Sequence, residues 1–152
     1  MGYRGYGSAG DAYHLTAPDP QGKGLQRAIL GALEESGVHA GDIGFINAHG
    51  TGTADNDRVE SKVLYELFPG VPFYSTKGCT GHTLGAAGAI EAAFTIASLK
   101  TGVIPSSAGF EERDPELPAH PVEQKSTVPG RVALSQSLAF GGSNAVLIFG
   151  KE

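Results

Sequence analysis

The chain has 152 residues, of which 23 are glycine and only one is cysteine, and its 11 basic and 16 acidic side chains give a formal charge of −5. Glycine is roughly twice as frequent as in ordinary proteins; the three-residue period of collagen is lacking, and 40% hydrophobic residues argue against disorder. The single cysteine excludes an internal disulfide framework, and without a run of basic residues nucleic acid is not an expected partner.

The length predicts one domain over residues 1–152. No apolar segment reaches the roughly 20 residues that a membrane span requires, and no secretory signal is visible. A single cysteine fits a reducing compartment. We therefore expect a soluble, cytoplasmic protein that does not bind membranes.

The first eleven residues are rich in glycine and aromatic residues and are predicted to form neither a helix nor a strand. Gly5, Gly7 and Gly10 have the spacing G-x-G-x-x-G, which binds dinucleotides only where it follows a strand and opens a helix. Too little chain precedes these glycines for that strand, and Pro18 and Pro20 follow them. The sequence therefore argues against a dinucleotide site.

Apolar residues at helical spacing predict a helix from Leu25 that ends at Gly37. The apolar run 43–48 predicts a buried strand. A second helix follows, with Asp55 or Asn56 as its N-cap and a Pro-Gly pair at its end, and then a short strand over 73–75.

A third helix is predicted over about 83–99. It is apolar nearly all round apart from Glu91, which is typical of a helix inside a protein. One stripe of it consists of small residues that would let another backbone approach closely: Gly85, Gly88, Ala89 and Ala92. A small domain cannot easily cover such a helix on every side, so a missing partner is indicated.

The rest of the chain predicts a strand at 103–104, a proline-rich excursion over 105–129, and two strands over 132–138 and 145–149. Phe140-Gly141-Gly142 joins the last two strands. Helices and strands alternate before this pair, so the fold class is α/β, with layers of helices on a sheet.

Two histidines follow predicted strands, where α/β sheets usually bind ligands. His49 comes after strand 43–48, and His82 lies in a glycine-rich turn that is expected to open the third helix. The positive end of that helix would keep His82 neutral. Two neutral donors at this edge suit a developing oxyanion or enolate; a purely structural pair is the alternative.

The same region also contains residues of the types that bind metal ions. His49, Asp55, Asp57 and His82 are metal-ligand types, but their spacing fits no metal signature, so no metal is expected. Asp57 with Glu60 instead resembles a helix capping box.

Cys79 precedes His82 by three residues and could be an activated nucleophile. This spacing does not ensure that the sulfur meets the imidazole, so a small residue filling a turn is the favoured interpretation.

Three motifs in register carry a family resemblance: residues 46–53 (INAHGTGT), 77–88 (KGCTGHTLGAAG) and 140–144 (FGGSN). In this order and spacing the chain resembles the C-terminal half of a β-ketoacyl-acyl carrier protein synthase, the ketosynthase of fatty-acid and polyketide synthesis. The stretches 7–18 and 114–118 also resemble that half. The resemblance implies half of a thiolase-like fold, with a layered mixed sheet flanked by helices.

The resemblance also implies roles for individual residues. His49 and His82 match the two histidines that hydrogen-bond the malonyl thioester oxygen and stabilise the enolate formed on decarboxylation. Lys77 matches the lysine that supports this pair, and Glu60 matches a carboxylate behind it. The family's nucleophilic cysteine belongs to the N-terminal half, and Cys79 does not lie at its position.

The substrate tunnel of the family is matched by four further residues. Thr51 and Thr53 match hydroxyls that contact the pantetheine arm, and Phe140 with Gly141 matches an aromatic gate beside the pocket. The sequence departs from the family at Ala139, where a glycine is usual, and at Gln136, where an asparagine is usual. Ala139 puts the mobility of the gate, and hence the choice of acyl chain, in question.

The resulting hypothesis is an acyltransferase half that is inactive without a cysteine-bearing half. Its implied partners are that half and an acyl carrier protein, in a homo- or hetero-oligomer such as a dimer. No cofactor of its own is expected, because phosphopantetheine carries the substrates. The alternative is a non-catalytic, ketosynthase-like scaffold that shapes an acyl tunnel.

Overall fold

The main strands form one mixed sheet in a computed structural model that describes residues 2–151. Its strands are β1 (Gly2–Gly10), β2 (Ile43–Asn47), β3 (Phe73–Tyr74), β6 (Val132–Ala139) and β7 (Ser143–Gly150). The order across the sheet is β1-β7-β6-β2-β3. β7 is antiparallel to both of its neighbours, whereas β6, β2 and β3 run parallel. β4 (Val103–Ile104) and β5 (Ser126–Thr127) form a separate antiparallel pair.

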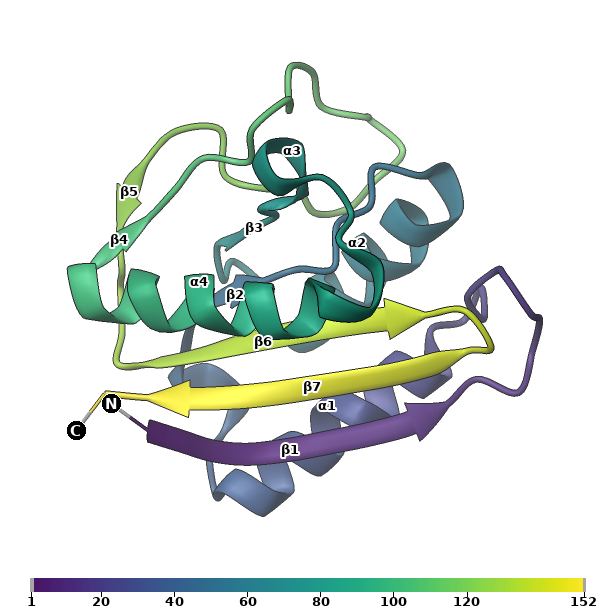
Figure 1. Ribbon diagram of the computed structural model, residues 1–152, viewed down its shortest axis with the longest axis horizontal. Helices are drawn as coiled ribbons and strands as arrows, with labels where there is room; N and C mark the ends of the chain where they lie inside the picture. The colour runs from purple at the N-terminus through teal and green to yellow at the C-terminus, as the bar shows by residue number, and fades with distance from the viewer. Residues whose placement is uncertain (1, 152) are drawn as a thin grey trace.

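Helices cover both faces of this sheet (Figure 1). They are α1 (Lys23–Ser36), α2 (Ala54–Leu67), the short α3 (Lys77–Thr80) and α4 (Ala87–Thr101), with 3-10 turns at Ala40–Asp42 and Leu84–Ala86. α1 and α2 share one apolar core with the sheet, and α4 packs over β6, β2 and β7 on the other face. The predicted α/β class, with a mixed sheet flanked by helices, is confirmed. Among the helices of residues 2–151, none has the length and apolarity needed to cross a bilayer.

The predicted elements after residue 20 are found within a few residues of their expected bounds, but β1 was missed. β1 is an edge strand whose Gly5 and Gly7 lie against α1. A Cβ at Gly7 would overlap the carbonyl of Ala28, so the glycines allow close packing of helix on strand. Gly5 and Gly7, which belong to the pattern that resembles a dinucleotide motif, therefore serve to pack α1 closely against β1.

The predicted third helix, over about 83–99, is found as α4 but begins later than expected. The chain forms α3, then a loop with a 3-10 turn, and α4 begins only at Ala87. Leu84 lies in the left-handed region at φ 52°, which prevents one continuous helix from running through this segment.

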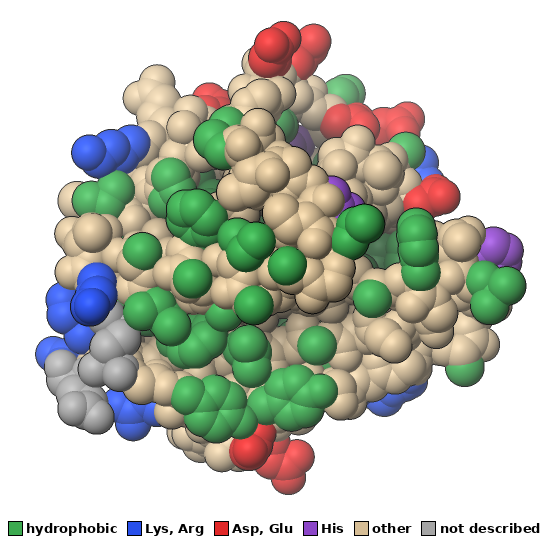
Figure 2. Space-filling model, viewed as in Figure 1, with side chains coloured by type: hydrophobic (Ala, Val, Ile, Leu, Met, Phe, Trp, Pro, Cys, Tyr) green, Lys and Arg blue, Asp and Glu red, His purple; other side chains and the backbone are tan. Residues whose placement is uncertain are grey.

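α4 has an inverted pattern of polarity. Its buried side carries the polar residues Glu91, Thr95 and Ser98. Its outer face, as we call the exposed apolar residues on the other side, consists of Ala86, Ala89, Ala93, Phe94 and Ala97. Figure 2 shows hydrophobic side chains gathered on this side of the molecule. The small-residue stripe is divided, since a Cβ at Gly85 would meet open space and one at Gly88 would meet Ser137.

The start of α2 differs from the prediction. The N-cap residue is Thr53, and neither Asp55 nor Asn56 caps the helix. The capping box of Asp57 with Glu60 is also wrong, because Asp57 lies inside α2 and the buried carboxylate of Glu60 accepts from the His49 N–H and from Gln136.

Candidate active site

The carboxyl ends of three parallel strands meet at one edge of the sheet. His49 follows β2, Lys77 follows β3, and the β6–β7 turn lies at the same edge because β6 is parallel to β2. An open cleft of about 960 Å³ lies here, with both His49 and His82 in its lining. This is the edge at which open α/β sheets bind ligands.

The two predicted histidines are neighbours in the structure. Their ring centroids lie 5.4 Å apart, with the ring planes at 81°. The Lys77 ammonium donates to Nδ1 of His49, and the Leu84 backbone N–H donates to Nδ1 of His82, both at 3.2 Å. A ring nitrogen that accepts a hydrogen bond carries no proton, so each neutral ring has its proton on Nε2. The cleft therefore contains two imidazoles that can donate through Nε2.

The two rings are fixed by different devices. Burial, the charge of Lys77 and the proximity of His82, in that order of size, together lower the pKa of His49 to about 3. His49 is therefore neutral at neutral pH. The helical segment after His82 begins with the 3-10 turn Leu84–Ala86, which continues into α4. The N–H of its first residue, Leu84, donates to His82 and orients the ring.

Lys77 lies beneath His49 in a buried ion pair with Glu91. Its ammonium also donates to the His49 carbonyl, and the Ser137 hydroxyl donates to Glu91 Oε2 at 3.3 Å. Burial raises the pKa of the Glu91 carboxyl, and Lys77 opposes this rise. Glu91 was not among the predicted site residues. The sequence offers one indication of its role: Glu91 is the only charged residue of the predicted third helix, over 83–99.

Glu60 anchors the turn that carries His49. One carboxylate oxygen accepts the His49 N–H at 2.6 Å and the other accepts the Gly50 N–H at 2.8 Å. Asn56 and Gln136 donate to the same carboxylate, at 3.0 and 2.6 Å. Burial raises the pKa of Glu60, and these four donors oppose the rise.

Gly50 completes this turn. Its φ is 50°, and a Cβ here would overlap the side chain of Ser75, so a glycine is required. The Ser75 hydroxyl donates to the Gly50 carbonyl at 3.0 Å. Every backbone polar group of His49 and Gly50 therefore has a partner, which fixes the direction of the imidazole.

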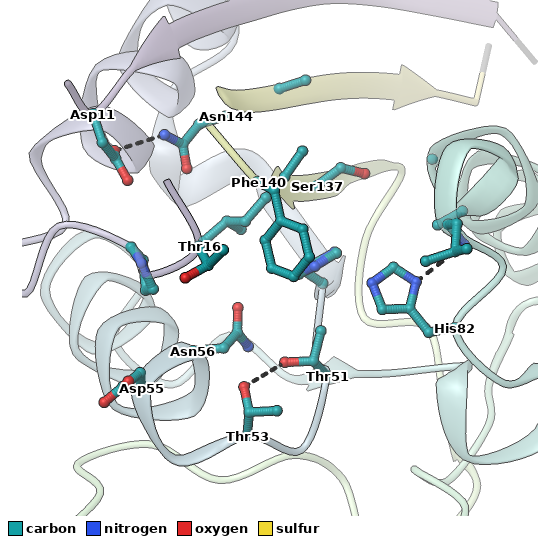
Figure 3. Close-up of a pocket in the computed structure, with 18 of the residues that line it drawn as sticks. Asp11, Thr16, Thr51, Thr53, Asp55, Asn56, His82, Ser137, Phe140 and Asn144 are labelled. Carbon is teal, nitrogen blue, oxygen red and sulfur yellow. Dashed lines mark hydrogen bonds between the residues drawn. The ribbon is translucent and has the colours of Figure 1, made fainter. Parts of the chain in front are cut away.

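Three of the four predicted tunnel residues, Thr51, Thr53 and Phe140, line the same cleft (Figure 3), and Gly141 lies beside Phe140 outside the lining. Thr51 and Thr53 lie on one side with their hydroxyls 2.9 Å apart. Phe140 comes from the β6–β7 turn and is 77% exposed. Gly141, at φ 81°, donates its N–H to the Leu15 carbonyl at 2.7 Å. Ala139 ends β6 and is not among the residues with positive φ, so the missing glycine causes no backbone strain here.

Two hydrogen bonds of Asp11 hold the β6–β7 turn, and neither was predicted. Asn144 Nδ2 donates to Asp11 Oδ1 at 2.7 Å, and the Asp11 N–H donates to the Gly142 carbonyl at 2.7 Å. Figure 3 shows this pair at the edge of the cleft. The two residues are 133 positions apart, so no local pattern could have revealed the contact.

The alternative chemistry gains no geometric support. Cys79 is exposed and lines neither this cleft nor a second cleft of about 650 Å³. Within residues 2–151, no group of three or more His, Cys, Asp or Glu side chains is arranged to hold a metal ion.

Comparison with known proteins gives consistent matches. Residues 2–111 match the family model described as "Beta-ketoacyl synthase, C-terminal domain". The chain is 41% identical over 152 residues to "3-oxoacyl-[acyl-carrier-protein] synthase 2" of Staphylococcus aureus, covering 97% of this chain and 37% of that protein. It is 40% identical over 153 residues to the mitochondrial "3-oxoacyl-[acyl-carrier-protein] synthase" of Arabidopsis thaliana, covering 95% of this chain and 33% of that protein.

Solved structures agree in fold. The ketosynthase ApeO of Xenorhabdus doucetiae, in complex with its chain length factor ApeC, matches with a TM-score of 0.94 and 41% identity, over 99% of this chain and 39% of that one. A type II polyketide ketosynthase (AntDE) in complex with its acyl-carrier protein (AntF) matches with a TM-score of 0.92 and 29% identity, over 98% and 38%. The chain therefore spans little more than a third of the length of these proteins.

Proposed function

Because the chain belongs to the β-ketoacyl synthase family and corresponds to its C-terminal domain, we propose that it supplies the two histidines for decarboxylative condensation of a malonyl thioester with an acyl chain. The observation that carries this proposal is the pair of imidazoles, His49 and His82, whose ring centroids lie 5.4 Å apart in the cleft. Both protons that the pair can donate are on Nε2, as the contacts to Nδ1 require.

The proposed chemistry is decarboxylation of the malonyl thioester followed by condensation with the acyl group. The bond between the carboxylate carbon and the α-carbon of the malonyl group breaks, carbon dioxide leaves, and the electron pair moves to the thioester oxygen. The Nε2–H groups of His49 and His82 donate to that oxygen and stabilise the enolate, which is the kind of preorganised donor pair that lowers such barriers. The enolate carbon then attacks an acyl thioester on the cysteine of another half, and the cysteine thiolate leaves.

The surroundings of His49 support this role. An imidazolium would transfer its proton to the enolate, whereas a neutral imidazole donates a hydrogen bond and keeps its proton. Burial and the Lys77 charge keep His49 neutral. Thr51 and Thr53 line the cleft, and we propose that their hydroxyls contact the pantetheine arm of an acyl carrier protein.

We place the cysteine-bearing half on the outer face of α4. Chains of this family that match here are nearly three times as long, and this apolar face is the side of α4 that the described residues leave open. The half that covers it would bring its thiol to the cleft, so the 152 residues alone are expected to be inactive in condensation.

Decarboxylation of a malonyl carrier by the assembled protein tests the proposal. Replacing both His49 and His82 by alanine is expected to lower the rate of decarboxylation at least about a hundredfold, which is the effect of losing oxyanion donors. His39→Ala is the matched control, since His39 is exposed and does not line the cleft. If the double variant kept full turnover, the chain would be a scaffold that shapes a tunnel without chemistry.

A further inference from the structure

Gln136 is a buried residue of β6 that the proposed chemistry does not use. Its side chain is fully buried, and its Nε2 donates to Oε1 of Glu60 at 2.6 Å. Its Oε1 is buried without a partner among the described residues. The side chain therefore makes one strong contact, and that contact is with the carboxylate that holds the His49 turn.

The orientation of the Gln136 side-chain amide indicates the protonation state of Glu60. With the amide reversed, a carbonyl oxygen would face a carboxylate oxygen at 2.6 Å, which only a protonated carboxyl group tolerates. The other neighbours of this carboxylate, the N–H groups of His49 and Gly50 and the Asn56 amide, all donate. A set of four donors suits an ionised Glu60, which accepts on both oxygens and donates nothing.

Gln136 differs from the other three donors in its origin. His49 and Gly50 belong to the turn itself and Asn56 lies on the same helix as Glu60, whereas Gln136 comes from β6, 76 residues away. It is the donor that ties Glu60 to the sheet. The charged groups nearby do not replace it: Glu91 is an acid already paired with Lys77, and Asp57 shares the Asn56 amide.

We propose that Gln136 is a positioning residue for His49: by donating to Glu60 it holds the carboxylate against the backbone N–H groups of His49 and Gly50, and so fixes the imidazole in the cleft. The inference rests on the proposed function of His49 for its catalytic consequence. Its structural part, that Gln136 keeps Glu60 ionised on the turn, stands independently.

The experiment uses the chain assembled with its cysteine-bearing half and labelled with ¹⁵N-histidine, so that at most five histidine amides of this chain are labelled. Gln136→Leu removes the donor while keeping a side chain of similar length. Gln26→Leu is the matched control, because it removes an exposed bond of the same chemistry, from Gln26 to Glu66 at 3.0 Å. Two quantities are followed from pH 6 to 8: the amide resonance of His49 and the rate of malonyl decarboxylation.

In the wild type and in Gln26→Leu, the His49 amide resonance is expected to stay constant over this range. In Gln136→Leu the pKa of Glu60 should rise, because a hydrogen bond that favours its charged form is lost, so the resonance should change at the acidic end of this range. Decarboxylation at pH 6 relative to pH 8 should then fall below the wild-type ratio. If Gln136→Leu does not fold, Gln136→Met, an unbranched side chain of similar length that also lacks the donor, should show the same changes.

Two results would overturn the inference. One is a variant that loses stability while its His49 resonance and pH profile follow the wild type, which would make Gln136 a merely structural residue. The other is a wild-type resonance that already titrates in this range, which would mean a protonated Glu60 and a reversed amide. Because the resonance needs no turnover, failure of the proposed function would leave this readout intact.

Discussion

Lys77 and Glu91 form an ion pair that α4 buries against the sheet, with their side chains 7% and 2% exposed. The pair joins Lys77, at the start of α3, to Glu91 on α4. Through Lys77 it reaches both Nδ1 and the carbonyl of His49. Removing water from two charges is costly, and the mutual attraction and added hydrogen bonds offset that cost only while both partners are present.

Glu91→Gln is therefore expected to lower the free energy of unfolding by about 3–5 kcal/mol, because it leaves a buried ammonium without a counter-charge. Denaturant unfolding of the assembled protein measures this loss. Glu123→Gln is the control: Arg113 and Glu123 pair at 2.6 Å, but their side chains are 64% and 48% exposed. An exposed pair contributes at most about 1 kcal/mol. Equal losses in the two variants would contradict the argument.

The lowered pKa of His49 predicts a pH dependence of stability. Below its ordinary value of 6.5 the unfolded chain binds a proton at His49, and the folded chain does not until about pH 3. Stability contributed by neutral His49 is thus present above pH 6.5 and is lost as the pH falls. Relative to His49→Gln, the wild type should lose about 1.4 kcal/mol per pH unit through this window.

The comparison with His49→Gln is needed because Glu60 acts in the opposite direction. Its pKa is raised by burial, so its contribution falls as the pH rises above the ordinary value of 4.5. Above pH 4.5 the two effects therefore have opposite signs in the wild-type curve. Urea unfolding of both proteins at several pH values gives the difference, and a difference that does not change with pH would show that His49 is not desolvated.

The sequence predicted the elements whose periodicity is set by burial. α1 and α2 have one apolar side each, β2 is an apolar run, and the meeting of His49 with His82 followed from their places after parallel strands. β1 was missed because its packing against α1 depends on Gly5 and Gly7, which carry no hydrophobic signal.

The network behind the histidines could not be predicted by local reasoning. Glu60 looked like a capping residue because it lies three positions after Asp57, yet three of its four donors come from the preceding turn and from β6. Gln136 and Glu60 are 76 residues apart, and Lys77 and Glu91 lie on separate helices. Such pairs form only when the order of the strands in the sheet brings distant segments together. The spacing of residues along the chain therefore does not predict them.

The outer face of α4 predicts how the 152 residues behave without a covering partner. Exposed apolar area of this kind favours association, so the isolated chain should self-associate or bind a hydrophobic dye. Phe94→Asp should reduce both, because Phe94 is 41% exposed within that face. Leu30→Asp is the control, since Leu30 is 53% exposed but lies on α1, across the sheet. Sedimentation and dye fluorescence measure the effect, and a monomer that binds no dye would count against a covering partner.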